Sequence, residues 1–138
     1  MPNVVFDASV LVSAILKQDS LPEKALLLAR EVDCITFSIA TLSEIKEVLS
    51  RPFFARFVSD SKREEFLSLL CSRAAFFEPS ETIHDCRDAK DNKYLELAVE
   101  SHAAIIISGD EDLLILNPYR GISIVNPSGY IRLRTGQK

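Results

Sequence analysis

Short apolar segments alternate with helical patterns along the sequence, and this alternation constrains the fold more than any other feature. The strand candidates are residues 3–6, 34–38, 75–78, 104–108 and the short segment 122–125. The helical patterns cover residues 9–17, 20–30, 41–49, 61–73 and 91–101, with a short helical connector at 53–58. Strands separated by helices run parallel, because each helix returns the chain to the edge where the previous strand began. We therefore expect an α/β fold, a three-layer α/β/α sandwich around a short parallel sheet of four to five strands.

Three of these helices carry the signature of a capping box, in which a hydroxyl and a glutamate three residues later bond free backbone N–H groups. The pairs are Ser20 with Glu23, Thr41 with Glu44, and Ser61 with Glu64. They predict where the helices begin. The last five residues, 134–138, have no such pattern, and we expect them to fray.

Length and composition predict one ordinary soluble domain covering residues 1–138. The chain has 138 residues, of which 47% are hydrophobic and 26% charged, and its formal net charge is -4. This acidic balance argues against a protein that coats nucleic acid, which would carry a basic surface. It does not argue against a nuclease, because acids that bind metal lower the net charge.

Targeting and cysteine patterns predict a cytoplasmic protein. The first residues, MPNVVFD, lack the basic segment and long apolar run of a signal peptide, and no apolar run approaches the length of a membrane span. Cys34, Cys71 and Cys86 are an odd number without C-x-x-C spacing. Reduced, structural cysteines are expected rather than disulfides or a zinc site.

Acidic side chains directly follow two of the predicted strands. Asp7 ends the first strand, and Asp110 and Asp112 come just after residues 104–108. In open parallel sheets, ligands bind beyond the carboxyl ends of the strands, where the strand order reverses. If these two strands are neighbours, the three carboxylates meet there. The alternatives are a helix N-cap for Asp110 and a first-turn acid for Asp112.

Three further acids are candidates for the same place. Glu44 lies about 40° around its helix from Val48, on the edge of the apolar stripe, and can point towards the sheet end; the alternative is its place in the capping box. Asp91 opens a helix whose inner face carries Leu95, and its alternative is an acid that complements the helix dipole. Asp88 lies in a predicted loop, where a cap or a solvated acid explains it equally well.

Several converging carboxylates repel one another and usually require a cation, for which Mg²⁺ and Mn²⁺ are the natural choices. Ser108 and Asn92 could orient such a ligand set, although hydrogen bonds to the backbone would explain them as well. Ser9 is interpreted as a helix cap rather than a nucleophile, because no histidine lies near it in sequence. His84 and His102 are too isolated for a zinc site and are expected at the surface.

The chain resembles the PIN domain, the ribonuclease fold of many toxins of toxin–antitoxin pairs, and in particular its VapC-like toxin components. The resemblance covers essentially the whole chain. It rests on VVFDASVLVSAIL, SIATLSEIKEVLSRP, RDAKDNKYLELAVESHA and IIISGDEDLLIL, in this order. A single aspartate is weak evidence, whereas D-N-K-Y-L-E-L-A followed by S-G-D-E-D-L at this spacing is fairly specific.

The resemblance implies a hydrolase that uses Mg²⁺ or Mn²⁺ to cut single-stranded RNA, leaving a 5′-phosphate and a 3′-hydroxyl. The matching catalytic and metal-binding acids are Asp7, Glu44, Asp91 and Asp110, with Asp112 as a fifth metal ligand. The expected partners are RNA, an antitoxin protein and a second copy in a homodimer, with no membrane. A non-catalytic PIN-fold module that binds a partner protein or RNA is the alternative.

Two further features bear on partners. Basic residues near the motifs could guide an RNA backbone or could simply be solvated charges; they are Lys46, Arg51, Arg87, Lys90 and Lys93. The apolar segment 53–58 is either a partner or dimer surface or a connector packed against the core. Receiver and dehalogenase-like domains also end a strand in aspartate, but their paired acids are missing from D-A-S at residues 7–9.

Overall fold

The computed structural model describes residues 1–136. The strands are β1 (Asn3–Phe6), β2 (Cys34–Phe37), β3 (Ala75–Phe76), β4 (Ile105–Ile107) and β5 (Ser123–Val125). The helices are α1 (Ala8–Leu16), α2 (Leu21–Val32), α3 (Ile39–Leu49), α4 (Pro52–Ala55), α5 (Asp60–Ser72), α6 (Asn92–Glu100), α7 (Glu111–Leu114) and α8 (Pro127–Thr135), with a 3-10 turn, η1 (Ala89–Asp91), before α6.

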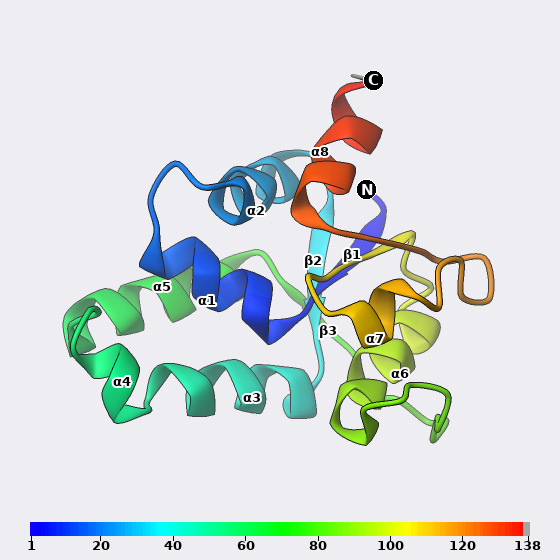
Figure 1. Cartoon of the computed structure of the whole chain (residues 1–138), viewed down its shortest axis with the longest axis horizontal. Helices are drawn as coiled ribbons and strands as arrows, with labels where there is room; N and C mark the ends of the chain where they lie inside the picture. The colour runs from blue at the N-terminus through cyan, green and yellow to red at the C-terminus, as the bar shows by residue number, and fades with distance from the viewer. Residues whose placement is uncertain (137–138) are drawn as a thin grey trace.

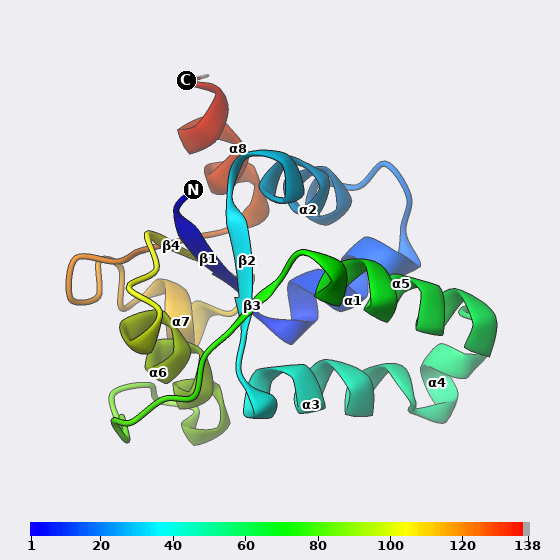
Figure 2. The same ribbon diagram turned by 180° about the vertical axis from the view of Figure 1, so that it is seen from behind.

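The described residues form a five-stranded parallel sheet in the order β3-β2-β1-β4-β5, which confirms the predicted fold class. β1 lies in the middle and pairs with β2 on one side and β4 on the other. The order therefore reverses between β1 and β4, the position where open parallel sheets bind ligands. β3 forms one edge, beside β2 in Figure 2.

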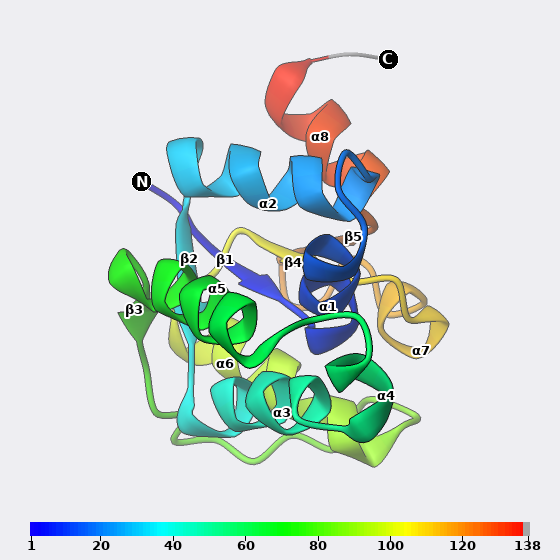
Figure 3. The ribbon, with the colours of Figure 1, turned by 90° about the vertical axis from the view of Figure 1, so that its left-hand side faces the viewer.

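Helices cover both faces of the sheet, as Figure 1 shows: α1, α2, α3 and α5 lie on one side, and α6 and α7 on the other. Side chains of β1 alternate between the two cores. Val4 and Phe6 belong to the core that includes α1 and α2, whereas Val5 belongs to the core beneath α6. This alternation follows from the two-residue period of a strand. Figure 3 shows α1 packed between α2 and α3.

Two of the three predicted capping boxes are wrong, because those helices begin earlier than predicted. α3 is capped by Ser38, whose hydroxyl accepts from the N–H of Thr41. Ser59 caps α5 in the same way. Both hydroxyls come directly before the first helical turn, which is where a cap must lie. The Ser20 cap of α2 is confirmed.

The C-terminal helix α8 was missed by the sequence analysis, which expected residues 134–138 to fray. Asn126 caps α8 and Pro127 occupies its first turn, a recognisable start signal. Arg134 holds the helix by a two-pronged ion pair with buried Asp33, at 2.8 and 2.9 Å. Residues 137 and 138 of the segment expected to fray lie outside the described residues.

Several smaller expectations can also be compared with the fold. β3 is two residues long rather than four, and residues 77–88 continue as a loop. His84 and His102 are exposed, as predicted. Within the described residues all three cysteines are free thiols. None of the helices in residues 1–136 is long and apolar enough to cross a membrane.

Candidate metal centre

Asp7 is fixed at the carboxyl end of β1 by hydrogen bonds to both of its carboxylate oxygens. Oδ1 accepts from the N–H of Val10 at 2.9 Å and from the hydroxyl of Ser9 at 2.7 Å. Oδ2 accepts from the hydroxyl of Ser108, at the end of neighbouring β4. Asp7 therefore caps α1, and Ser9, which was predicted to be a cap, instead donates to Asp7. Burial raises the pKa of Asp7, against the effect of these hydrogen bonds.

Glu44 points from α3 to the same sheet end and is held by Tyr94 of α6. The Tyr94 hydroxyl donates to Oε1 of Glu44 and accepts from the N–H of Ala8 at 3.0 Å. Lys93 contributes an ion pair of 3.2 Å to Oε2. Burial and the Glu44 carboxylate raise the pKa of Tyr94, so its hydroxyl stays protonated and remains a donor.

Tyr94 was missed as a candidate site residue, because the sequence analysis assigned it to the apolar face of its helix. The ring is buried, with 2% of its surface exposed, so the assignment to the core is correct. A buried tyrosine nevertheless needs a partner for its hydroxyl. That requirement was the available signal, but it could not identify the partner 50 residues away.

Asp91 and Asp110 are adjacent acids whose pKa values shift in opposite directions. Asp91 is buried, and no donor among residues 1–136 reaches its Oδ2 atom. Burial, followed by the hydrogen bond and charge of Asp110, raises the pKa of Asp91 to about 7. The same contact lowers the pKa of Asp110, helped by the N–H of Asp112. The shifts are opposite because two adjacent carboxyl groups disfavour carrying two negative charges.

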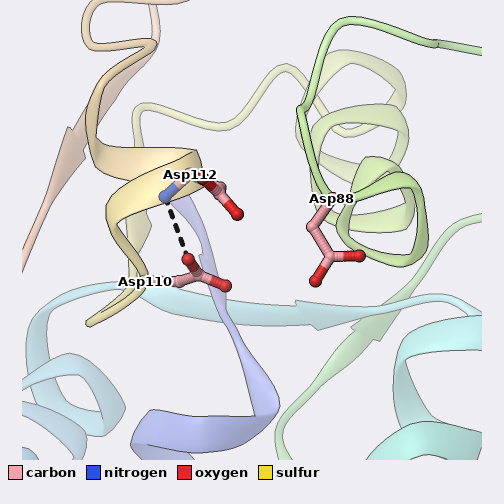
Figure 4. A group of neighbouring side chains, drawn as sticks. All are labelled: Asp88, Asp110 and Asp112. Atoms are coloured by element: carbon pink, nitrogen blue, oxygen red, sulfur yellow. Dashed lines mark hydrogen bonds between the residues drawn. The ribbon is translucent and has the colours of Figure 1, made fainter.

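A second group of carboxylates adjoins this pair. Oxygen atoms of Asp88, Asp110 and Asp112 lie within 4.8 Å of one another. Figure 4 shows Asp110 and Asp112 at the start of α7 and Asp88 facing them from the opposite loop. Asp88 also caps η1 by accepting from the N–H of Lys90, at 3.3 Å. Both interpretations left open for Asp88, a cap and a member of the acidic group, therefore describe its position.

The two residues predicted to support the ligands behave differently. Ser108 links two of the acids, because its hydroxyl donates to Asp7 and accepts from the N–H of Asp110 at 3.0 Å. Asn92 contacts the backbone instead: Oδ1 accepts from the N–H of Cys86, and Nδ2 donates to the carbonyl of Ala89. Its amide holds the loop that carries Asp88 rather than any of the acids.

One open hollow of about 530 Å³ collects the four acids of the predicted core. Asp7, Glu44, Asp91 and Asp110 all line it. Of the five basic residues considered, Arg51 and Lys90 line this hollow and Lys93 pairs with Glu44. Lys46 and Arg87 are exposed and lie outside the lining formed by the described chain.

The donor set fits a divalent cation. It consists of carboxylate oxygens, the ligands that hard ions such as Mg²⁺ and Mn²⁺ prefer. The buried Oδ2 atom of Asp91 has no donor, and a buried acceptor normally has a partner. A cation would supply that partner and would offset the burial and the repulsion that together raise the pKa of Asp91.

Comparisons with known proteins identify the family of this chain. The sequence profile of the PIN domain matches residues 3–112, which include all of the candidate acids. The chain belongs to the PIN domain family. An uncharacterized protein of Methanocaldococcus jannaschii, MJ1680, is 33% identical over 116 residues, which are 83% of this PIN domain chain and 74% of the relative.

Two solved structures share the PIN fold of this chain. A chain of VapBC2 from Rickettsia felis, crystallised with a DNA fragment from the promoter, superposes with a TM-score of 0.61 at 14% identity. The match covers 90% of this chain and 98% of that one. PAE2754 from Pyrobaculum aerophilum gives a TM-score of 0.63 at 18% identity, over 97% of this chain and 90% of that chain. At 14% and 18% identity, the two comparisons show a shared fold and nothing more.

Proposed function

We propose that this PIN domain is a Mg²⁺- or Mn²⁺-dependent endoribonuclease that hydrolyses phosphodiester bonds of single-stranded RNA. One observation carries the proposal: four carboxylates from distant segments line one hollow, and one of them has a buried oxygen without a donor. The residues proposed to hold the main ion are Asp7, Glu44, Asp91 and Asp110. Family membership supports the reaction class, since PIN domains are generally nucleases.

Divalent ions bound here would activate water and neutralise the charge that develops on the phosphate oxygens. The chain supplies rigid positioning for them. Ser9, Ser108 and the N–H of Val10 leave the Asp7 carboxylate little freedom to rotate. Tyr94 does the same for Glu44. Ligands held in this way need little reorganisation when substrate binds, which is how active sites keep their geometry.

A second ion is proposed between Asp110 and Asp112, with Asp88 as a third ligand. The separation of their oxygens, within 4.8 Å, suits a shared cation. Asp110 would then serve both proposed ion sites, and two ions would share the charge of the phosphate. No serine nucleophile is required, and the Ser9 hydroxyl is already committed to Asp7.

The test is cleavage of a labelled single-stranded RNA with Mn²⁺, with EDTA, and by the Asp7→Asn and Glu44→Gln variants. We expect cleavage only with metal and only by the unmodified chain. Glu47→Gln is the matched control, because Glu47 lies on the same helix but is exposed and paired with Arg51. Cleavage that survives both EDTA and Asp7→Asn would refute the mechanism. Metal binding without cleavage would favour the non-catalytic module.

A role as the toxin of a type II toxin–antitoxin pair is proposed on narrower grounds. Its support is the fold shared with a chain of VapBC2, a complex solved with promoter DNA. An antitoxin protein would be the partner, and a homodimer the assembly. Co-expression with the product of the neighbouring gene tests this: an antitoxin should restore growth to cells that the unmodified chain arrests, whereas Asp7→Asn should not arrest growth at all.

A further inference from the structure

The hollow that holds the acids continues well beyond them. It runs along one face of α1, formed by Ser9, Val12, Ser13 and Leu16. Positions spaced by three and four residues share one side of a helix, so this lining is a continuous stripe. The opposite wall is α3, which contributes Val48 one turn after Glu44. We call this extension the α1–α3 groove.

The α1–α3 groove is elongated, with the acids at one end and aromatic rings at the other. Asp7 comes directly before α1 and Leu16 ends it, so the groove spans the nine residues of the helix, or roughly 13 Å at 1.5 Å per residue. Phe53 and Phe54 of α4 line the far end. Figure 1 shows α4 at the end of α3 away from the sheet, with α1 alongside.

Phe53 is an exposed ring on a firm support. It is 58% exposed and lines the same hollow as the acids. Phe54 packs against the core and meets the Phe53 ring edge-on, at 5.1 Å between ring centroids. Phe57 meets it from another side, at 5.4 Å. The ring is therefore held in place while much of its surface stays open to the groove.

We propose that the α1–α3 groove holds the single-stranded RNA segment next to the scissile phosphate, with Phe53 stacked on one of its bases. This inference rests on the proposed function. For a polymer whose phosphate lies at the acids, the groove is the continuation of the same hollow. Nucleotides stacked at ~3.4 Å would place Phe53 about four positions from the cut. Arg51, which pairs with Glu47, also lines the groove and would place its guanidinium beside the phosphates.

Chemistry favours a nucleic acid over a protein in this groove. Aromatic rings that take stacked bases, next to basic side chains that follow the backbone, are the usual means of holding single strands without sequence preference. Arg56 lies beside Phe57, with its guanidinium 6.0 Å from the ring centre, and is not part of the groove lining formed by the described residues. Phe53 would act as a positioning residue, since it lies away from the reacting atoms.

The first test measures binding of a labelled ten-nucleotide RNA by fluorescence anisotropy in Ca²⁺, with the RNA checked for integrity afterwards. Phe53→Ala should weaken binding about tenfold, in the range of a lost base stack, and Phe53→Trp should restore it. Phe76→Ala is the matched control, because Phe76 is similarly exposed, at 54%, but lies on β3. Equal effects of Phe53→Ala and Phe76→Ala, or none from either, would overturn the proposal.

A second test identifies the contact as a base stack. RNA probes that carry one abasic site, placed at successive positions, should reveal one position at which the RNA affinity of the unmodified chain falls by the same tenfold. At that position Phe53→Ala should cause no further loss, because the interaction is already absent. Additive losses at every position would contradict stacking by Phe53.

Cleavage and oligomeric state separate this proposal from its rivals. With active protein, Phe53→Ala should raise the KM for a ten-nucleotide RNA more than it lowers kcat, because Phe53 lies away from the reacting atoms. RNA binding that depends on Phe53 without any cleavage would defeat the proposed function but not the groove. If Phe53→Ala instead converts a dimer to a monomer in sedimentation and leaves RNA binding intact, the surface is a protein interface and the groove proposal is wrong.

Discussion

Asp33 and Asp91 are buried to nearly the same degree, with 3% and 6% of their surfaces exposed, but their surroundings are opposite. Asp33 accepts two hydrogen bonds from Arg134 and one of 2.5 Å from the hydroxyl of Tyr130. Asp91 has an oxygen that no donor in residues 1–136 reaches, and its neighbour is a second carboxylate. One buried acid is fully compensated within the chain, and the other is not.

The two acids lie at opposite ends of the sheet, which explains the difference. Asp33 precedes β2 and joins α2 to the C-terminal helix. Asp91 lies with Asp7 and Asp110 at the carboxyl ends of the strands. A buried charge with all of its partners stabilises one conformation, whereas a cluster without them destabilises the metal-free fold and favours cation binding. Burial alone therefore does not distinguish a structural acid from a functional one.

The largest expected effect is on activity. Asp91→Asn should lower Mn²⁺-dependent RNA cleavage by about 10³-fold or more, because an amide is a poor ligand for a hard cation. Asp33→Asn should leave the cleavage rate of the folded protein within a few-fold of the unmodified rate. Initial rates at saturating Mn²⁺ measure both. Equal losses of cleavage from the two variants would mean that Asp91 is no more important for activity than Asp33.

The next effect is on stability. Asp33→Ala leaves Arg134 and the Tyr130 hydroxyl without their partner, and we expect the free energy of unfolding to fall by about 3 kcal/mol. Urea denaturation of the metal-free protein measures this. Glu31→Ala is the control, because Glu31 is an exposed acid in the last turn of α2, just before Asp33, and it should change stability by less than about 0.5 kcal/mol. A small effect of Asp33→Ala would mean that α8 is held by its apolar contacts alone.

The pH dependence of the metal-free protein comes third. The pKa of Asp91 is raised to about 7 in the folded chain, against about 4 when unfolded, so the folded state binds more protons between these values. The contribution of Asp91 to the free energy of unfolding is therefore greatest below pH 4 and falls as pH rises towards 7. We expect the free energy of unfolding to fall by ~2 kcal/mol over this range. This is less than the whole pKa shift would give, because solvent in the hollow screens the charges.

Thermal melting from pH 5 to 8 in EDTA measures this loss. Asp91→Asn should flatten the profile and raise the melting temperature at pH 8. Millimolar Mn²⁺ should stabilise the unmodified chain most at high pH, because the ion competes with the proton for the same carboxylates. A melting temperature that does not respond to Mn²⁺ at any pH would count against the metal centre.

The smallest effect concerns the support of Glu44. Tyr94→Phe removes the hydroxyl that holds this carboxylate, and we expect Mn²⁺ affinity to fall about tenfold, as for other ligand-orienting contacts. Stability should fall by ~1 kcal/mol, because the N–H of Ala8 loses its acceptor. Tyr119→Phe is the matched control, since it removes a hydroxyl bonded to Asp85, outside the hollow. Calorimetric titration with Mn²⁺ should find no change in affinity for that variant.

The sequence predicted the parts of the fold that depend on local pattern. Apolar runs identified all of the strands described, and Asp7 and Asp110 were placed correctly at the ends of adjacent β1 and β4. Helix starts were less reliable: Ser38 and Ser59 cap α3 and α5, where the pattern of hydroxyl and glutamate suggested later residues. A capping motif is short enough to recur by chance inside a helix, so spacing alone cannot locate the true start.

The supporting contacts of the candidate site could not be predicted in the same way. Tyr94 and Glu44 are 50 residues apart, and Ser108 and Asp7 are 101 apart. Asn92 was a candidate support with hydrogen bonds to the backbone as the alternative, and its amide does bond the backbone of the preceding loop. Hydrogen-bond direction depends on where the neighbouring backbone lies, and this is known only once the chain has folded.

By itself the sequence determined a parallel α/β sheet with acids at the carboxyl ends of its strands, because the period of apolar residues and the order of elements are local properties. Only the tertiary structure decided which buried acid is compensated and which is not. It brought Arg134 to Asp33 and no donor of the described chain to Oδ2 of Asp91. The physical reason is that a carboxylate's pKa and cation affinity depend on distances between residues far apart in the chain.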